Sequence, residues 1–316
     1  MNPKRIIIDT DPGIDDSLAI LLALASPEIQ LEALTVTQGN VTVETGTHNA
    51  LAVLELLNAS HIPVAQGCSL PIVNPLLASD HVHGESGLGN AHLPEPTKKP
   101  VHQHAIDYLI ERFLAEPGEI SLFAIGPLTN VALAIRKEPR IAGAVKEMVI
   151  MGGAIREGGN ITPQAEFNIY ADPHAAHVVF HSGIPITLIP LDVTQKCMLY
   201  AAQIEKLNLR ESSISRFIAD STVPYINFTK SKTSVDGCAL HDPLTLATVI
   251  APELFIFEEH YVDVDISSGP STGSTFADFY HTTGKPANMR IALDVRGEKF
   301  VELFLQHMEV LITDEH

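Results

Sequence analysis

Short runs of β-branched residues alternate along the chain with longer segments whose apolar residues recur at helical spacing. The strands that this pattern predicts are Lys4–Ile8, Gln30–Thr37, Ile62–Ala65, Ile120–Ile125, Lys146–Met151 and Ile184–Ile189. The helices that it predicts are Asp15–Ala25, Val43–Asn58, Val101–Glu116, Leu128–Lys137, Pro173–His181 and Ala239–Ile250. Strands and helices in this order predict an α/β fold with an open, mostly parallel, Rossmann-like sheet that is covered by helices on both faces.

Three parts of the chain depart from this alternation. Residues 191–233 are predicted to form an inserted helical region, and the tail from about His260 mixes small strands with a final helix at Glu298–Glu309. Two polar loops, residues 68–100 and 152–170, are long, and long loops are often functional. Because no repeat, linker or low-complexity tract interrupts the chain, we expect residues 1–316 to form a single domain.

The charge balance restricts the partners. The chain has 38 acidic and 20 basic residues and a net charge of −18 at pH 7. Nucleic acids and anionic membrane surfaces bind basic patches, so we expect neither as a partner. The negative electrostatic field of such a chain does not oppose the binding of an uncharged small molecule. The excess acid also suits a cation site, although a solvated acidic surface is the commoner reason for it.

The cysteines and the N-terminus indicate a reducing compartment. Cys68, Cys197 and Cys238 form no CxxC pair and no disulfide framework, so we expect reduced, mostly buried thiols, and these cysteines imply no zinc or iron–sulfur site. The first apolar run, residues 6–8, ends at Asp9 and is too short for a signal peptide. No apolar run reaches transmembrane length. We therefore expect a cytoplasmic protein.

Polar residues and glycines follow the carboxyl ends of the predicted strands, where open α/β sheets bind their ligands. The first strand leads into DTDPGIDD at residues 9–16, and the second leads into QGN at residues 38–40. The strand that ends at Ile125 leads into GPLTN at residues 126–130. The strand that ends at Met151 leads into two glycines and then reaches Asn160, Glu166 and Asn168. The pattern predicts a site of carboxylates, amides and glycines at one edge of the sheet.

Four aspartates lie within residues 9–16, and their negative charges repel one another. A helix N-terminus tolerates one or two of them as caps, which explains Asp15 or Asp16 alone. Capping does not explain why Asp9 and Asp11 face the same place. A hard divalent cation such as Ca²⁺, which prefers several oxygen ligands, explains the whole cluster.

Three other chemistries match the sequence less well. Asp9-x-Asp11 after a strand resembles the nucleophile motif of the haloacid dehalogenase phosphatases. That motif has Thr or Val two residues after the second aspartate, where this chain has Gly13. The sequence contains no P-loop, and no dinucleotide-binding GxGxxG motif opens the chain. GESG at residues 84–87 is one residue too short for a GxSxG nucleophile elbow.

DTDPGIDD at residues 9–16 resembles the N-terminal signature of the inosine/uridine-preferring nucleoside hydrolases. Further blocks that resemble this family follow in the family's order at residues 83–88, 126–130, 151–153, 166–168 and 241–243. The resemblance covers essentially the whole chain and is greatest to the bacterial ribonucleoside hydrolases that prefer pyrimidines. It implies hydrolysis of the N-glycosidic bond of a ribonucleoside to ribose and free base, and a homotetramer or homodimer.

The resemblance also implies roles for individual residues. The Ca²⁺ ligands of the family match Asp11, Asp16, the backbone carbonyl of Ile125, and Asp242. The ribose-binding residues of the family match Asp15, Asn40, Asn160, Glu166 and Asn168, with Met151 beneath the sugar.

On the base side, the resemblance matches His241 and His83 to base-side histidines of the family. Alone, His241 would more often be a capping or packed histidine, but its place next to Asp242, a ligand in the family, favours a functional role. Phe167 is explained equally well by core packing and by a wall that stacks on the base. Tyr225 and Phe228, in the inserted region, are either core residues or a lid over the base.

These residues also bear on which base is bound. One subgroup of the family places tryptophan at the base, and this chain has none. Polar candidates without a tryptophan suit a small pyrimidine ring such as that of uridine or cytidine. A broad inosine–uridine hydrolase is the alternative.

The chemistry of the implied reaction agrees with these residues. Breaking the bond between ribose and base develops positive charge on the sugar, which surrounding carboxylates and amides stabilise. Asp11 is the best general base for the attacking water, and His241 can help the base to leave as a neutral species. The alternative in another class is a catalytically silent nucleoside- or sugar-binding protein that keeps the metal for stability. Such a protein would be free to lose Asp11.

Overall fold

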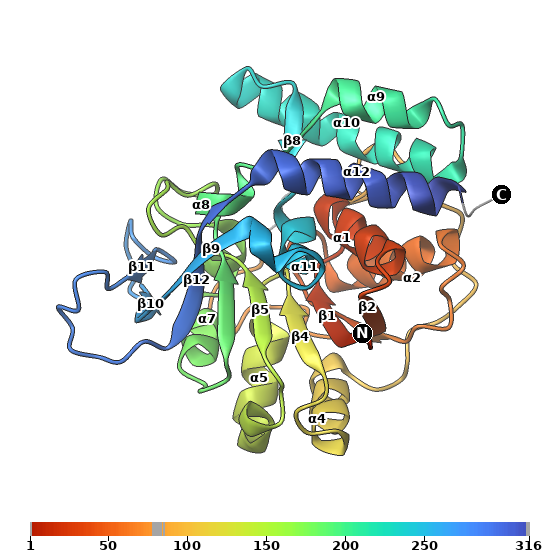
Figure 1. The fold of residues 1–316 in the computed structure, drawn as a ribbon. Helices are drawn as coiled ribbons and strands as arrows, with labels where there is room; N and C mark the ends of the chain where they lie inside the picture. Colours follow the sequence, from red (N-terminus) through yellow and green to blue (C-terminus); the bar gives the residue numbers. More distant parts are fainter. Residues whose placement is uncertain (1, 78–83, 85, 314–316) are drawn as a thin grey trace.

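The computed structural model describes residues 2–77, 84 and 86–313. Within these residues, an eight-stranded sheet has the order β3-β2-β1-β4-β5-β6-β12-β9 (Figure 1). The strands are β1 (Lys4–Thr10), β2 (Ile29–Val36), β3 (Val64–Gln66), β4 (Ser121–Ala124), β5 (Met148–Met151), β6 (Ile186–Ile189), β9 (Phe255–His260) and β12 (Met289–Val295). All neighbouring strands are parallel except β12 and β9. The first six follow the strand order of a doubly wound sheet, so the predicted fold class is confirmed.

Helices cover both faces of this sheet (Figure 1). One layer contains α1 (Ile14–Ala25), α2 (Val43–Leu56), α11 (His241–Ile250) and α12 (Gly297–Thr313). The other contains α4 (Ala105–Ala115), α5 (Thr129–Lys137) and α7 (Pro173–Phe180). In β1, Ile6 and Ile8 pack into the first core and Ile7 packs into the second, because successive side chains of a strand point to opposite faces. A continuous apolar run therefore indicates a strand buried on both faces.

Two small antiparallel ladders stand outside the main sheet. β7 (Met198–Tyr200) pairs with β8 (Gly237–Ala239), and β10 (Val262–Val264) pairs with β11 (Thr275–Ala277). The inserted region begins with α8 (Leu191–Thr194), and α9 (Ala201–Asn208) and α10 (Ser213–Thr233) connect β7 to β8. The remaining short helices are η1 (Pro139–Gly143), α6 (Phe167–Ala171) and η2 (Pro252–Leu254).

Several predicted boundaries are wrong. The helix predicted from Val101 begins at Ala105, where the side chain of His104 caps it by accepting a hydrogen bond from the Ile106 N–H. The helix predicted from Ala239 begins at His241, because Ala239 pairs with Met198 as the end of β8. Such pairing joins residues far apart in sequence, and periodicity within one segment does not reveal it.

Two further differences concern strands. The strand predicted at Ile62–Ala65 lies at Val64–Gln66, and β9 begins at Phe255, before the predicted start of the mixed tail.

The three cysteines are buried and unpaired, as expected. In the described part of the chain, no helix has both the length and the apolar character needed to cross a membrane.

Candidate active site

The carboxylate of Asp16, in the first turn of α1, organises the loop that follows β1. It accepts hydrogen bonds from Thr10 Oγ1 (2.5 Å), from the backbone N–H groups of Asp11 (3.1 Å) and Gly13 (3.1 Å), and from Asn40 Nδ2 (2.9 Å). The bond from Gly13, the N-cap residue, makes Asp16 a cap of α1. The capping interpretation is therefore correct for this residue, and the same carboxylate ties the ends of β1 and β2 together.

Asp11 is fully buried between the glycines that follow β2 and β4. A Cβ atom at Gly39 would lie 2.0 Å from Asp11 Oδ2, and one at Gly126 would lie 2.4 Å from Asp11 Oδ1. The Asn40 N–H donates to Oδ2 at 2.7 Å, whereas Oδ1 is buried without a hydrogen-bond partner. Only residues without a side chain fit at positions 39 and 126, so the two glycines fix the place of this carboxylate.

Asp15 and Asp242 bring the N-termini of α1 and α11 together. The Asp242 N–H donates to Asp15 Oδ2 at 3.1 Å, and Asp15 Oδ1 is buried without a hydrogen-bond partner. Burial raises the pKa of Asp11, Asp15 and Asp242 well above that of an ordinary aspartate, and repulsion between neighbouring carboxylates raises it further. Among the ion pairs of the described residues, none joins these aspartates to a lysine or arginine. A bound cation would relieve this repulsion.

Glu166 and Asn168 hold the loop after β5 against the sheet. The Glu166 carboxylate accepts hydrogen bonds from the N–H groups of Asn168 (2.9 Å), Gly153 (3.0 Å) and Ile169 (3.1 Å), and its burial raises its pKa. Asn168 Nδ2 donates to the carbonyl oxygen of Ile125 at 2.8 Å. The predicted metal-ligating carbonyl is thus tied to a predicted ribose-binding amide.

A cavity of about 440 Å³ opens above these groups, a size that holds a small organic ligand. We call its sheet side the cavity floor, which consists of Asp15, Asn40, Ile125, Met151, Glu166, Asn168 and Asp242. Asn160, Phe167 and His241 also line the cavity. Asp11 and Asp16 are buried beneath the floor, where each accepts a hydrogen bond from Asn40. His83 lies outside the described residues.

Opposite the floor, α10 forms a wall that sequence reasoning found only in part. This α10 wall consists of Tyr225, Phe228, Thr229, Lys232 and Thr233. Both aromatic side chains proposed as core or lid therefore face the cavity. The remaining lining residues that sequence reasoning missed are Ile161, Gln195, Met198, Val235 and Ala239. Most of these follow from the β7–β8 ladder, which no local pattern indicates.

His241 lies at the first position of α11, directly before the floor residue Asp242, and lines the cavity. Its Nδ1 is 2.7 Å from Thr194 Oγ1 at the end of α8, and this contact fixes the orientation of the ring. An imidazole in this position can donate a proton to a leaving group bound in the cavity.

Comparison with known proteins agrees with this geometry. The family model of the inosine-uridine preferring nucleoside hydrolases matches residues 6–302. The chain belongs to this family. The pyrimidine-specific ribonucleoside hydrolase RihA of Klebsiella pneumoniae is 43% identical to this nucleoside hydrolase over 305 residues, which are 96% of this chain and 97% of RihA.

Two solved structures are closely similar. A purine-preferring ribonucleoside hydrolase from Gardnerella vaginalis has a TM-score of 0.93 and 33% identity, covering 98% of this chain and 100% of the other. A plant nucleoside hydrolase has a TM-score of 0.92 and 35% identity, covering 97% and 99% of the two chains. The predicted family and ribonucleoside hydrolysis are confirmed, and the substrate is a small nucleoside. The family is metal-dependent.

Proposed function

We propose that this nucleoside hydrolase uses Ca²⁺ and prefers pyrimidine ribonucleosides. The cation would be held by Asp11, Asp16, the carbonyl oxygen of Ile125, and Asp242. The observation that carries the metal proposal is the buried Oδ1 atom of Asp11, which has no hydrogen-bond partner and lies near two further buried carboxylates, Asp16 and Asp242. Carboxylate and carbonyl oxygens are the ligands that hard cations prefer.

The choice of Ca²⁺ rests on the family resemblance and on the proposed donors, which are all carboxylate or carbonyl oxygens.

The floor residues and the aspartates beneath the floor would act on two parts of the reaction, the attacking water and the sugar. When bound, the cation would lower the pKa of a water molecule at the site. Asp11 would accept the proton of the attacking water as general base. Asp15 Oδ1, also buried without a partner, would accept a hydrogen bond from a ribose hydroxyl. The other ribose contacts would come from Asn40, Met151, Asn160, Glu166 and Asn168, which all line the cavity.

The base would lie between His241, Phe167 and the α10 wall. His241, oriented by Thr194, would protonate the leaving base. Two observations support the pyrimidine preference. RihA of Klebsiella pneumoniae, 43% identical, is named pyrimidine-specific, and the chain has no tryptophan to stack on a purine.

Release of reducing sugar tests the activity and its metal. We expect hydrolysis of uridine that is lost when a chelator removes the metal and is restored by added Ca²⁺. Restoration by Mg²⁺ alone would contradict the choice of metal, and no hydrolysis of any nucleoside would favour the silent binding protein.

The measurement of kcat/KM for uridine, cytidine, inosine and adenosine tests the base preference. Inosine at or above uridine would overturn the pyrimidine preference and leave the hydrolase in place.

The organisation of the protein is also part of this proposal. A single domain of residues 1–316, a homotetramer or homodimer, and a cytoplasmic location stay predictions. Gel filtration with light scattering and cell fractionation test the last two.

A further inference from the structure

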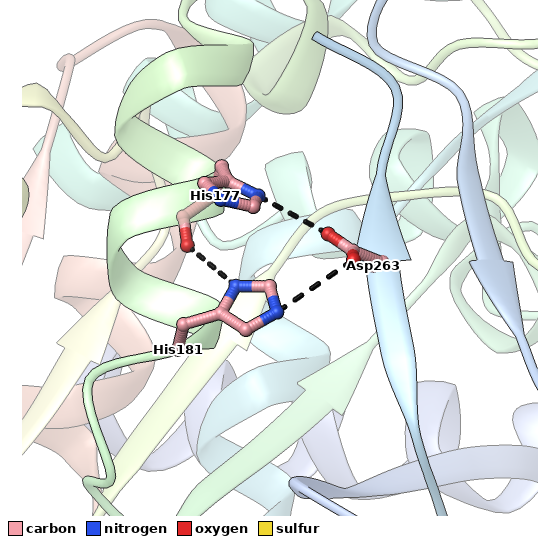
Figure 2. Close-up of side chains that lie close together, drawn as sticks. All are labelled: His177, His181 and Asp263. Atoms are coloured by element: carbon pink, nitrogen blue, oxygen red, sulfur yellow. Dashed lines mark hydrogen bonds and ion pairs between the residues drawn. The ribbon is translucent and has the colours of Figure 1, made fainter. Parts of the chain in front are cut away.

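A second group of metal-ligating side chains lies on α7 and β10, away from the active-site cavity. One ligand atom from each of His177, His181 and Asp263 lies within 4.8 Å of the other two. Figure 2 shows both imidazole rings on one side of α7, facing the carboxylate on β10. None of the three lines the active-site cavity, so the nucleoside hydrolase reaction does not explain the group.

Two distances within this cluster are close to those between neighbouring ligands of a metal ion. His177 Nδ1 is 3.2 Å from Asp263 Oδ1, and His181 Nε2 is 3.6 Å from Asp263 Oδ2 (Figure 2). Tetrahedral Zn²⁺ with bonds of about 2.0–2.1 Å places neighbouring ligand atoms about 3.3 Å apart. Two histidines four positions apart on a helix lie on the same face, so one ion can reach both.

The hydrogen bonds select the histidine tautomer that a metal needs. His181 Nδ1 is 2.9 Å from the backbone carbonyl oxygen of His177, which only accepts, so Nδ1 carries the proton. In the neutral ring, the lone pair of Nε2 therefore points to Asp263 Oδ2 (3.6 Å) and Tyr261 Oη (3.2 Å), and a bound ion would replace the Tyr261 contact. A backbone carbonyl that fixes the second nitrogen of a histidine is typical of metal sites.

Hydrogen bonds hold the carboxylate of Asp263 in place. Oδ2 accepts from Tyr261 Oη at 2.6 Å, and Oδ1 accepts from the Val264 N–H at 2.9 Å. Burial raises the pKa of Asp263, but these hydrogen bonds and the nearby histidines lower it below the ordinary value. Both carboxylate oxygens are therefore positioned before an ion binds.

The two elements that carry the ligands are clamped together. Asn288 Nδ2 donates to the carbonyl oxygens of Phe180 in α7 (3.0 Å) and Val262 in β10 (2.9 Å), and Asn288 Oδ1 accepts from the Val262 N–H (2.8 Å). Asp172 and Pro173 fix the start of α7 as cap and first helical residue. The cluster thus stands on a rigid support, which lowers the entropy cost of binding an ion.

One neighbouring charge opposes a cation. Lys285 Nζ donates to Tyr261 Oη at 2.6 Å and lies 4.4 Å from the centre of the Tyr261 ring. Lys285 is exposed, so water screens its charge and the side chain can move away. The histidine side chains are 41% and 34% exposed, and an ion from solvent reaches them directly.

We propose that His177, His181 and Asp263 bind a divalent transition-metal ion such as Zn²⁺ that links α7 to the β10–β11 ladder. Imidazole nitrogens with one carboxylate suit Zn²⁺ better than Ca²⁺, which takes oxygen ligands. The three protein ligands leave the fourth position to water. The ion stabilises the fold at this edge and is separate from the metal of the reaction.

Zinc titration by calorimetry, on the full chain with excess Ca²⁺ present, tests this site. We expect saturable binding of Zn²⁺ to the wild type, and affinities about 100-fold lower for His177→Ala and for His181→Ala. Tyr261→Phe, which loses the hydrogen bond to Asp263, should lower affinity about tenfold. Lys285→Ala should raise affinity about two- to fivefold by removing a like charge.

His307→Ala is the matched control, because His307 Nδ1 makes the same 2.9 Å contact to the carbonyl four residues earlier, at Leu303. It should bind Zn²⁺ like the wild type. Zn²⁺ should raise the melting temperature of the wild type and of His307→Ala, and not that of the double variant of His177 and His181. Nucleoside hydrolysis with Ca²⁺ should be unchanged in these variants, which verifies folding. Equal Zn²⁺ affinity in all variants, or no saturable binding by the wild type, would overturn the proposal and leave a metal-free cluster of ion pairs.

Discussion

The cavity floor and the α10 wall face the same cavity but are built differently. The floor comes from strand ends and helix N-termini of the central sheet, and Asp11 beneath it is locked between Gly39 and Gly126. The wall comes from one helix whose cavity-facing residues are half-buried or exposed. A rigid floor suits the hydrolysis of the ribosyl bond, which is common to all nucleosides. A wall that can change its side chains or its shape suits selection between different bases. Purine- and pyrimidine-preferring relatives of this chain fit that division.

Replacing Asp11 tests the floor with the largest expected effect. Asp11→Asn keeps the size of the side chain and an acceptor for the Asn40 N–H, but it removes the charge and the general base. We expect kcat/KM to fall by about 10⁴-fold or more, and equally for uridine and inosine. Single-turnover assays with both nucleosides measure the loss. Near-wild-type turnover after metal removal would contradict the mechanism, and unequal losses would break the division between floor and wall.

His241 lines the cavity beside the floor residue Asp242. Its removal should affect the departure of the base and leave the chemistry at the sugar unchanged. His241→Ala should slow natural nucleosides by about 10²–10⁴-fold, the range for a lost acid–base group. It should hardly slow p-nitrophenyl riboside, whose leaving group needs no proton. Initial rates with both substrates measure this, and equal losses would instead assign His241 a structural role.

A methyl group at Gly126 tests whether the position of Asp11 is as critical as its charge. In Gly126→Ala, the new Cβ would meet Asp11 Oδ1 at 2.4 Å and displace the carboxylate. We expect kcat to fall by about 10²-fold, since small displacements of a reacting group are this costly. Gly143→Ala is the matched control, because nothing lies within 4 Å of its Cβ position. Comparable activities of the two variants would show that the floor is not rigid.

Truncation of the α10 wall should have the smallest effect. Phe228→Ala removes an aromatic face from the cavity, and we expect the uridine-to-inosine ratio of kcat/KM to change by up to about tenfold. The change should come mainly from KM, because a stacking contact is made in both the ground state and the transition state. Phe276→Ala, at an exposed position of β11, serves as the control. A large fall in kcat without a change in the ratio would place Phe228 in the chemistry instead.

The floor could be predicted from the sequence because its residues follow strand ends directly. Asp15, Asn40 and Ile125 each sit within a few residues of a buried apolar run, and parallel strands bring those ends to one edge. Their individual roles came from a family resemblance and stay predictions.

The rest of the cavity lining could be predicted only in part. Gln195, Met198 and Val235 lie in or beside the β7–β8 ladder, whose pairing joins residues far apart in sequence. The His177, His181 and Asp263 cluster was missed for the same reason, since its carboxylate lies 82 positions beyond His181.

The β7–β8 ladder also makes the inserted region exchangeable. Met198 pairs with Ala239, so the segment that carries α9 and α10 leaves the body of the protein and returns to it at adjacent points. A segment with neighbouring ends can be swapped as one cassette without altering the path of the chain elsewhere. Exchanging residues 201–236 between nucleoside hydrolases would therefore transfer the base specificity of one enzyme to the catalytic floor of another.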